Sequence, residues 1–229
     1  MVKNFIIAFS FGLLGCFSSQ AQTVQDIFTN YDIRVTWFGI DYSHSKIVGP
    51  ISSFGGKSPI SAQELRDSYY PAWNQLILDE PSKFALQSMI HRGSVAKDLS
   101  VVKQLNAATS LDSIEAPETP QYKRTEIQQF ISTYPLEGKT GIGLVFIAES
   151  MNKITDVAFY HVVFFNIETK EILLQERFKG NAGGFGLRNY WASSYGEVMT
   201  NIREDRYYKW KKEYMSNEDD SKSKVAPKW

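Results

Sequence analysis

The clearest alternation of apolar and polar positions lies in the last third of the chain. Residues 141–149, 156–167 and 171–179 are runs rich in apolar, β-branched and aromatic side chains, and only short polar segments separate them. Such runs with such short connections predict consecutive antiparallel strands, a β-meander. The middle run is apolar at both sets of alternating positions, so we expect it to be the buried centre of the sheet.

A further strand and several helices are predicted before the meander. Residues 34–41 are β-branched and aromatic and predict a central strand. Ser61 and Glu64 have the spacing of a capping box and predict the start of a helix over residues 61–79. Pro71 lies inside that helix and predicts a kink, because proline lacks the backbone N–H. The other expected elements are helices at residues 82–91 and 125–134, a short strand at residues 97–105 and an exposed connector at residues 107–122.

The strongest helical pattern follows the meander. Residues 187–202 place apolar side chains three and four positions apart, which predicts an amphipathic helix. We expect a charged helix to continue over residues 203–215 and residues 216–229 to form a disordered tail. The order of elements predicts one α+β domain over residues 22–215. In it, a mostly antiparallel sheet combines the N-terminal strand with the meander, and amphipathic helices pack on one face.

The first 21 residues have the organisation of an export signal. Lys3 supplies a positive charge, residues 5–14 are mostly apolar, and Ser19 and Ala21 form a small-x-small cleavage site. The apolar run is shorter than the about 20 residues that a membrane-spanning helix needs. We therefore expect cleavage and a periplasmic or outer-membrane-associated protein.

Cys16 leaves a second mature form open. It is the only cysteine, and with Leu13, Leu14 and Gly15 it resembles a bacterial lipobox, in which the cysteine becomes lipidated. Cleavage after Ala21 instead leaves a chain without cysteine. That chain would have no disulfide, no thiolate catalysis and no Cys-ligated zinc.

Composition narrows the classes of function. The chain has 25 basic and 25 acidic residues, so it lacks the basic surplus typical of nucleic-acid binding. With 43% hydrophobic and 14% aromatic residues, the chain has enough apolar side chains for a globular core. Outside the leader, no apolar run reaches membrane-spanning length.

The glycine-rich stretch between the third strand and the following helix is one candidate site. A loop with Gly183, Gly184 and Gly186 before a helix can present backbone N–H groups to an anion, and Arg188 could add charge. The spacing matches neither a Walker loop nor a dinucleotide fingerprint. The alternative is a corner in which the glycines, Gly180 included, let the helix start close against the sheet.

Residues 41–46 are the second candidate site. Asp41, Ser43, His44 and Lys46 follow a predicted strand, at a position where sites often lie. No nucleophile motif accompanies them, and a hydrogen-bonded turn explains the same residues. The histidines His44, His91 and His161 form no metal motif, so we expect no metal, no cofactor and no identified catalytic residue.

Two segments resemble known proteins. TWFGIDYSHSK and GGFGLRNYW are similar to stretches of uncharacterised exported proteins of Gram-negative bacteria. The order of meander and helix resembles small α+β sandwich envelope lipoproteins of the curli-secretion accessory type, a likeness of fold alone. We expect an exported protein that binds an envelope protein or a small ligand, or serves in envelope assembly, without catalysis. The alternative is a hydrolase or nucleotide-binding enzyme that uses residues 41–46 or the glycine loop.

Overall fold

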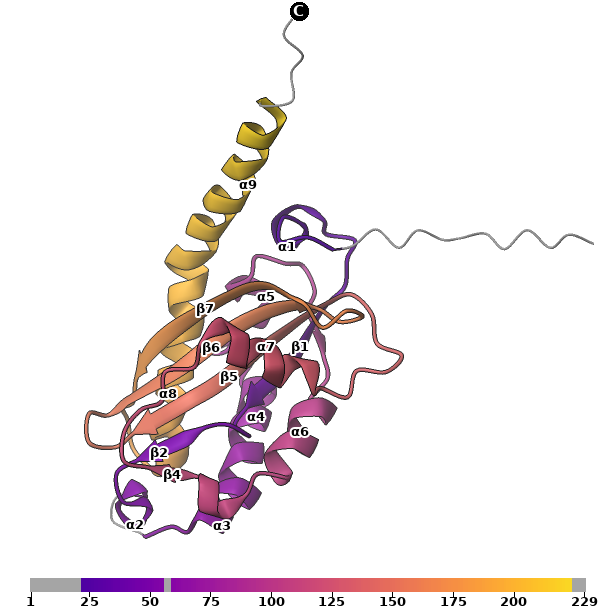
Figure 1. Cartoon of the computed structure of the whole chain (residues 1–229). Coiled ribbons are helices and arrows are strands. Elements are labelled where there is room, and N and C mark those ends of the chain that lie inside the picture. The colour runs from indigo at the N-terminus through magenta and orange to yellow at the C-terminus, as the bar shows by residue number, and fades with distance from the viewer. Residues whose placement is uncertain (1–21, 56–58, 224–229) are drawn as a thin grey trace, which may run out of the picture.

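A curled, mixed sheet organises the chain (Figure 1). The computed structural model describes residues 22–55 and 59–223, so the predicted leader and Cys16 lie outside the described residues. β5 is the central strand: it pairs with β1 and β2 along one side and with β6 along the other. The strands of the described residues are β1 (Val35–Asp41), β2 (Lys46–Val48), β3 (Ala96–Lys97), β4 (Glu115–Ala116), β5 (Ile142–Asn152), β6 (Val157–Asn166) and β7 (Ile172–Asn181).

The expectation of a mostly antiparallel sheet is wrong. Among the described strands, four of the six pairings are parallel, namely β1 with β3 and β5, and β2 with β4 and β5. The meander itself is confirmed, because β5, β6 and β7 pair antiparallel in chain order. The parallel pairings join segments roughly 60 to 110 residues apart through helical connections, and such crossovers leave no local pattern in the sequence.

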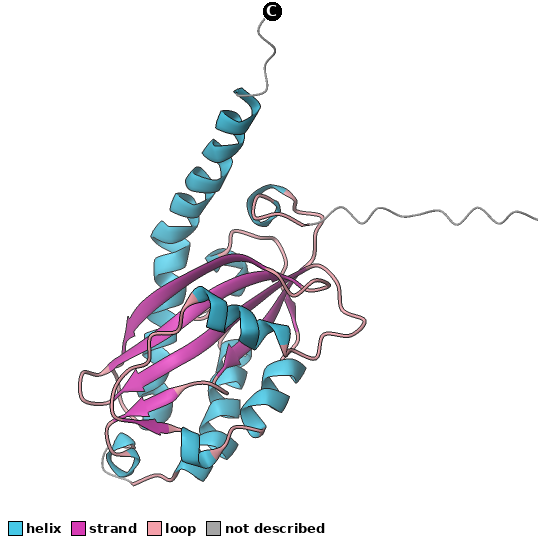
Figure 2. Cartoon of the chain, viewed as in Figure 1, coloured by secondary structure: helices cyan, strands magenta, loops and turns pink. Residues whose placement is uncertain are grey.

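Helices cover both faces of the sheet, which corrects the expectation of one covered face (Figure 2). Tyr134, just after α7, packs edge-on against Phe165, while Trp210 of α9 packs edge-on against the neighbouring Phe164. Adjacent strand residues point to opposite faces, so α7 and α9 lie on opposite sides. The helices are α1 (Asp26–Thr29), α2 (Ile51–Phe54), α3 (Ala62–Glu64), α4 (Tyr70–Asp79), α5 (Leu86–Met89), α6 (Ser100–Ala107), α7 (Arg124–Ser132), α8 (Leu187–Asn201) and α9 (Tyr207–Ser223), with 3₁₀ turn η2 (Leu111–Ser113) and π turns η1 (Leu65–Tyr69) and η3 (Ile202–Arg206).

The expected helix over residues 61–79 forms, with a π turn where a kink was expected. The Ser61 hydroxyl accepts the Glu64 N–H at 3.0 Å, as a capping serine should. The π turn η1 then leads into α4, whose first turn contains Pro71. The helical segment continues without a break from η1 into α4, and the wider π turn just before Pro71 accommodates a residue that lacks the backbone N–H.

The expected strand over residues 97–105 is wrong. β3 ends at Lys97, and Asp98 Oδ1 accepts hydrogen bonds from the Ser100 N–H and hydroxyl, which starts α6. The β-branched Val101 and Val102 are buried by helix packing rather than in a sheet. The helix expected over residues 82–91 is also shorter than predicted, being confined to α5, and the connector at residues 107–122 contains η2 and β4.

The amphipathic helix after the meander is confirmed as α8, and η3 and α9 extend it. Trp191, Tyr195 and Val198 bury its apolar stripe. α9 runs on to Ser223, through part of the stretch expected to be a tail, and residues 224–229 lie outside the described residues.

Candidate functional site

The glycine-rich stretch is a tight corner that brings α8 onto the sheet. A Cβ atom on Gly180 would lie 2.1 Å from the backbone oxygen of Ser194, so only glycine allows α8 to lie this close to β7. Gly184 and Gly186 have φ values of +106° and +76°, a region that favours glycine. At Gly183, by contrast, a Cβ would meet nothing nearer than 4.0 Å. Its N–H instead closes the loop by donating to the Tyr190 carbonyl at 2.9 Å.

Arg188 points away from this loop. Its guanidinium lies 3.5 Å from Glu80 at the end of α4, and its backbone carbonyl accepts the indole N–H of Trp73 at 2.9 Å. Arg188 therefore supplies no charge to the loop. α8 begins after Gly186 without a capping side chain. The structure does not bring the proposed anion-binding residues together.

Residues 41–46 form a hydrogen-bonded turn. Asp41 is fully buried, and its Oδ1 accepts the Ser43 N–H at 2.8 Å and the Ser43 hydroxyl at 2.6 Å. Its Oδ2 accepts the Tyr134 hydroxyl at 2.7 Å. The His44 ring instead stacks on Phe130, with 3.6 Å between ring centroids. Because serine catalysis needs the hydroxyl to donate to a histidine, this arrangement does not build a nucleophile.

The pKa of His44 is shifted by the same surroundings. Burial is the largest effect and lowers it, the nearby Asp41 raises it, and Lys46 lowers it further. The net result is a lowered pKa, which keeps the ring neutral at pH 7. A neutral ring suits its stacked position on Phe130.

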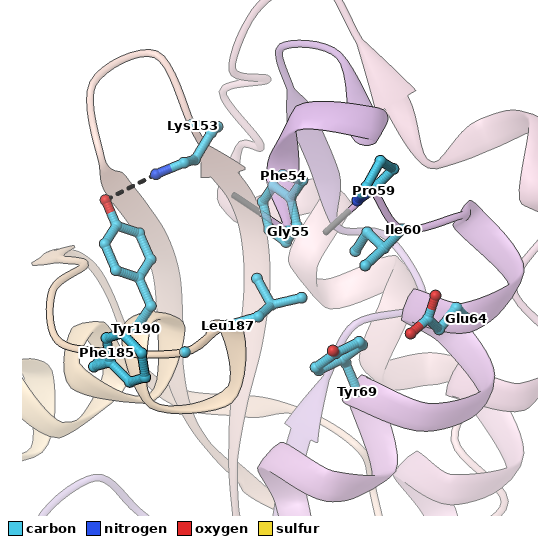
Figure 3. Close-up of a pocket in the computed structure, with 11 residues that line it drawn as sticks. Phe54, Gly55, Pro59, Ile60, Glu64, Tyr69, Lys153, Phe185, Leu187 and Tyr190 are labelled. Atoms are coloured by element: carbon cyan, nitrogen blue, oxygen red, sulfur yellow. Dashed lines mark hydrogen bonds between the residues drawn. The ribbon is translucent and has the colours of Figure 1, made fainter. Parts of the chain in front are cut away.

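An apolar groove of about 460 Å³ lies beside the glycine corner (Figure 3). It sits beyond the carboxyl ends of β2, β5 and β7, because α2 follows β2, the turn at residues 153–156 follows β5 and the glycine corner follows β7. Its apolar lining consists of Phe54, Ile60, Tyr69, Phe185, Leu187 and Tyr190. A concave, mostly apolar site with a few polar groups is the usual form of a ligand pocket.

Ring stacking and hydrogen bonds hold two sides of the groove in place. Phe54 is buried, and its ring stacks on Trp191 with 4.7 Å between centroids and 8° between planes. On the wall, Lys153 Nζ bonds the Tyr190 hydroxyl at 3.0 Å and Asp156 at 2.9 Å (Figure 3). Burial alone would lower the pKa of Lys153, but these hydrogen bonds outweigh that effect and raise it. A cation therefore stands at this side of the groove, with the Glu64 carboxylate at the other.

The mouth of the groove carries an exposed aromatic side chain. Phe185 is 94% exposed, although it lies between Gly184 and Gly186 on a constrained loop. Ile154, in the turn beside Lys153, is 74% exposed. An exposed aromatic side chain at a groove is typical of binding surfaces. The sequence reasoning missed this site, although Phe185 among four glycines was a possible signal.

The remaining polar candidates have structural partners. His91 Nε2 lies 3.1 Å from the Arg203 carbonyl, and His161 Nδ1 lies 2.8 Å from Gln175. In the described ranges 22–55 and 59–223, no cluster of three or more His, Cys, Asp or Glu side chains is placed to hold a metal ion.

No helix in the described part of the chain combines the length and apolar character needed to cross a membrane. No protein-family model matches the chain, and comparison with curated proteins finds no match.

Proposed function

We propose that this protein is exported and acts by binding, with the apolar groove as its binding site. The observation that carries the proposal is the 94% exposed Phe185 at the mouth of a groove of about 460 Å³. The groove fits an apolar side chain or acyl group of an envelope protein or a small ligand. Such an occupant would cover Phe185 and contact Leu187 and Ile60 inside the groove.

The geometry favours binding over catalysis. Ser43 donates to Asp41, and His44 packs on Phe130, so the turn at residues 41–46 lacks a base for a nucleophile. At the glycine corner, Arg188 is directed to Glu80. At these two described sites, the side chains lack the arrangement that hydrolysis or nucleotide binding requires.

The expected affinity for a simple apolar group is modest. Burying about 150–200 Å² of an aromatic or acyl group contributes roughly 4–5 kcal/mol. This corresponds to millimolar to submillimolar dissociation constants before the entropy of association is subtracted. A natural partner would therefore need contacts beyond the groove, and the exposed Ile154 is suitably placed for one.

Titration with the neutral fluorescent probe N-phenyl-1-naphthylamine tests the site. We expect Leu187→Glu to weaken probe binding at least about tenfold, because a carboxylate in the groove must lose water when the probe enters. Asn189→Glu is the matched control: it adds the same charge to the same first turn of α8, at an exposed position outside the groove lining. An acidic residue in a first turn favours the helix, so both variants should fold. Equal binding by Leu187→Glu and the unmodified protein would contradict the proposal.

Export is tested separately by expressing the full chain in a Gram-negative host and determining the mature N-terminus. We expect the envelope fraction to contain protein that begins at Gln22, or at an acylated Cys16 if the lipobox is used. Uncleaved protein confined to the cytoplasm would refute the export part of the proposal and leave the groove unaffected.

A further inference from the structure

The outer edge of β7 carries unpaired backbone groups. Within the described chain β7 pairs only with β6, and Figure 1 shows it at the border of the sheet. The Asn181 N–H points away from β6, because it donates to Glu197 at 2.7 Å. The antiparallel register is unbroken from Asn181 back to Leu174, so every second residue has the same orientation. The N–H and C=O groups of Lys179, Arg177 and Gln175 therefore also point outward.

Side chains hydrogen-bond the outward backbone groups at both ends of β7. At the start of β7, the Gln128 amide accepts the Ile172 N–H at 3.0 Å and donates to the Lys170 carbonyl at 2.8 Å, as a neighbouring strand would. At the far end, Glu197 holds Asn181. Between these ends, no described residue bonds the outward backbone groups of residues 175, 177 and 179. The open stretch is about 14 Å long at the usual rise of a strand.

The charges along the open edge favour an acidic strand over a second copy of β7. Arg177 and Lys179 share one face. The Arg177 side chain is 36% exposed and its guanidinium is paired with the buried Glu149, whereas Lys179 is exposed and has no ion pair among the described residues. An antiparallel second copy centred on Arg177 would place two arginines opposite each other. Like charges at opposed positions destabilise strand pairing, and charged edge residues are a known protection against self-association.

We propose that the open edge of β7 binds an extended acidic peptide segment of a partner protein by strand addition. Backbone hydrogen bonds to residues 175, 177 and 179 supply the pairing. An acidic side chain of the peptide faces Lys179, and acidic side chains at alternate positions share that face of the added strand. This edge is separate from the apolar groove, so the two sites do not depend on each other.

Fluorescence anisotropy with short labelled peptides tests the proposal on the full mature protein. We expect a seven-residue peptide that alternates Glu and Val to bind, and one that alternates Lys and Val to bind at least about tenfold more weakly. Methylating the alternate amide nitrogens of the acidic peptide that face β7 should also cost at least about tenfold, because it removes the hydrogen-bond donors. Undetectable binding of the acidic peptide at about 1 mM, or equal binding of its methylated form, would overturn the proposal.

A pair of variants separates backbone pairing from charge. Lys179→Pro removes the outward N–H while leaving the ladder to β6 intact, whereas Lys179→Val removes the charge and keeps the N–H. We expect the proline variant to bind the acidic peptide several-fold more weakly than the valine variant, and Leu187→Glu to bind it normally. Equal binding by the two Lys179 variants would overturn the proposal. If Lys179→Pro fails to fold, the methylated peptide decides the question with the unmodified protein.

Discussion

Replacing Glu149 with glutamine should lower the free energy of unfolding by about 1.5–3 kcal/mol. The Glu149 side chain is fully buried, and its carboxylate accepts the Arg177 guanidinium at 2.6 and 3.1 Å. His161 Nε2 lies 3.0 Å from the same carboxylate, in a polar contact that is not an aligned hydrogen bond. Glutamine would leave the charge of Arg177 without its partner. Urea denaturation at pH 7 measures the loss.

A matched control and a pH series sharpen this prediction. Glu171→Gln makes the same change at an exposed residue with no ion pair among the described residues, and should change stability by less than about 0.5 kcal/mol.

Burial alone would raise the pKa of Glu149, but the contacts with His161 and Arg177 outweigh it and lower the pKa. A lowered folded-state pKa contributes stability above the unfolded value of about 4.3, and this stability is lost as the pH falls through the folded-state pKa. The unmodified protein should thus lose more stability on acidification than Glu149→Gln. Parallel pH curves would contradict this role of Glu149.

Replacing Gly180 with alanine should cost about 3 kcal/mol of folding stability. The new Cβ would lie 2.1 Å from the Ser194 oxygen and 2.7 Å from its carbonyl carbon. Both atoms belong to the backbone of α8, so the clash can be relieved only by moving the helix off β7. Thermal denaturation followed by circular dichroism measures the effect.

Gly183→Ala provides the comparison on the same stretch. Its Cβ would meet nothing nearer than 4.0 Å, and Gly183 is not among the residues with positive φ. We expect a change within about 0.5 kcal/mol. Similar losses at Gly180 and Gly183 would show that the corner does not depend on close packing at Gly180.

The meander was predictable because its information is local. The apolar run of β6 and the alternating run of β7 each lie within a few residues, and the short turns between the runs require antiparallel neighbours. The pairing of β1 and β2 with β5 depends instead on contacts across roughly a hundred residues, which no periodicity encodes. The misassigned stretch at residues 97–105 shows a related limit. Asp98 and Ser100 form a hydrogen-bonded turn before α6, and helix packing outweighs the strand preference of Val101 and Val102.

The candidate site was less predictable than the fold. The packing role proposed for the glycine stretch is confirmed at Gly180. This role could be predicted because α8 directly follows β7 in the chain and must turn back onto it. The groove is built from Phe54, Tyr69, Lys153 and Leu187, which lie far apart in the sequence. Phe54 follows β2 and reaches the other side of the groove through the parallel pairing of β2 with β5. Residues 41–46 looked like a site because they lie together in the sequence. In the structure, Asp41 and Ser43 are hydrogen-bonded to each other in a turn.

Hydrogen–deuterium exchange with and without saturating N-phenyl-1-naphthylamine locates binding on the molecule most directly. We expect added protection in residues 51–55, 59–69 and 183–190, which contain most of the groove lining, and no change in residues 41–46. Protection concentrated in residues 41–46, or none in the groove segments when the probe is bound, would contradict a binding function at the groove.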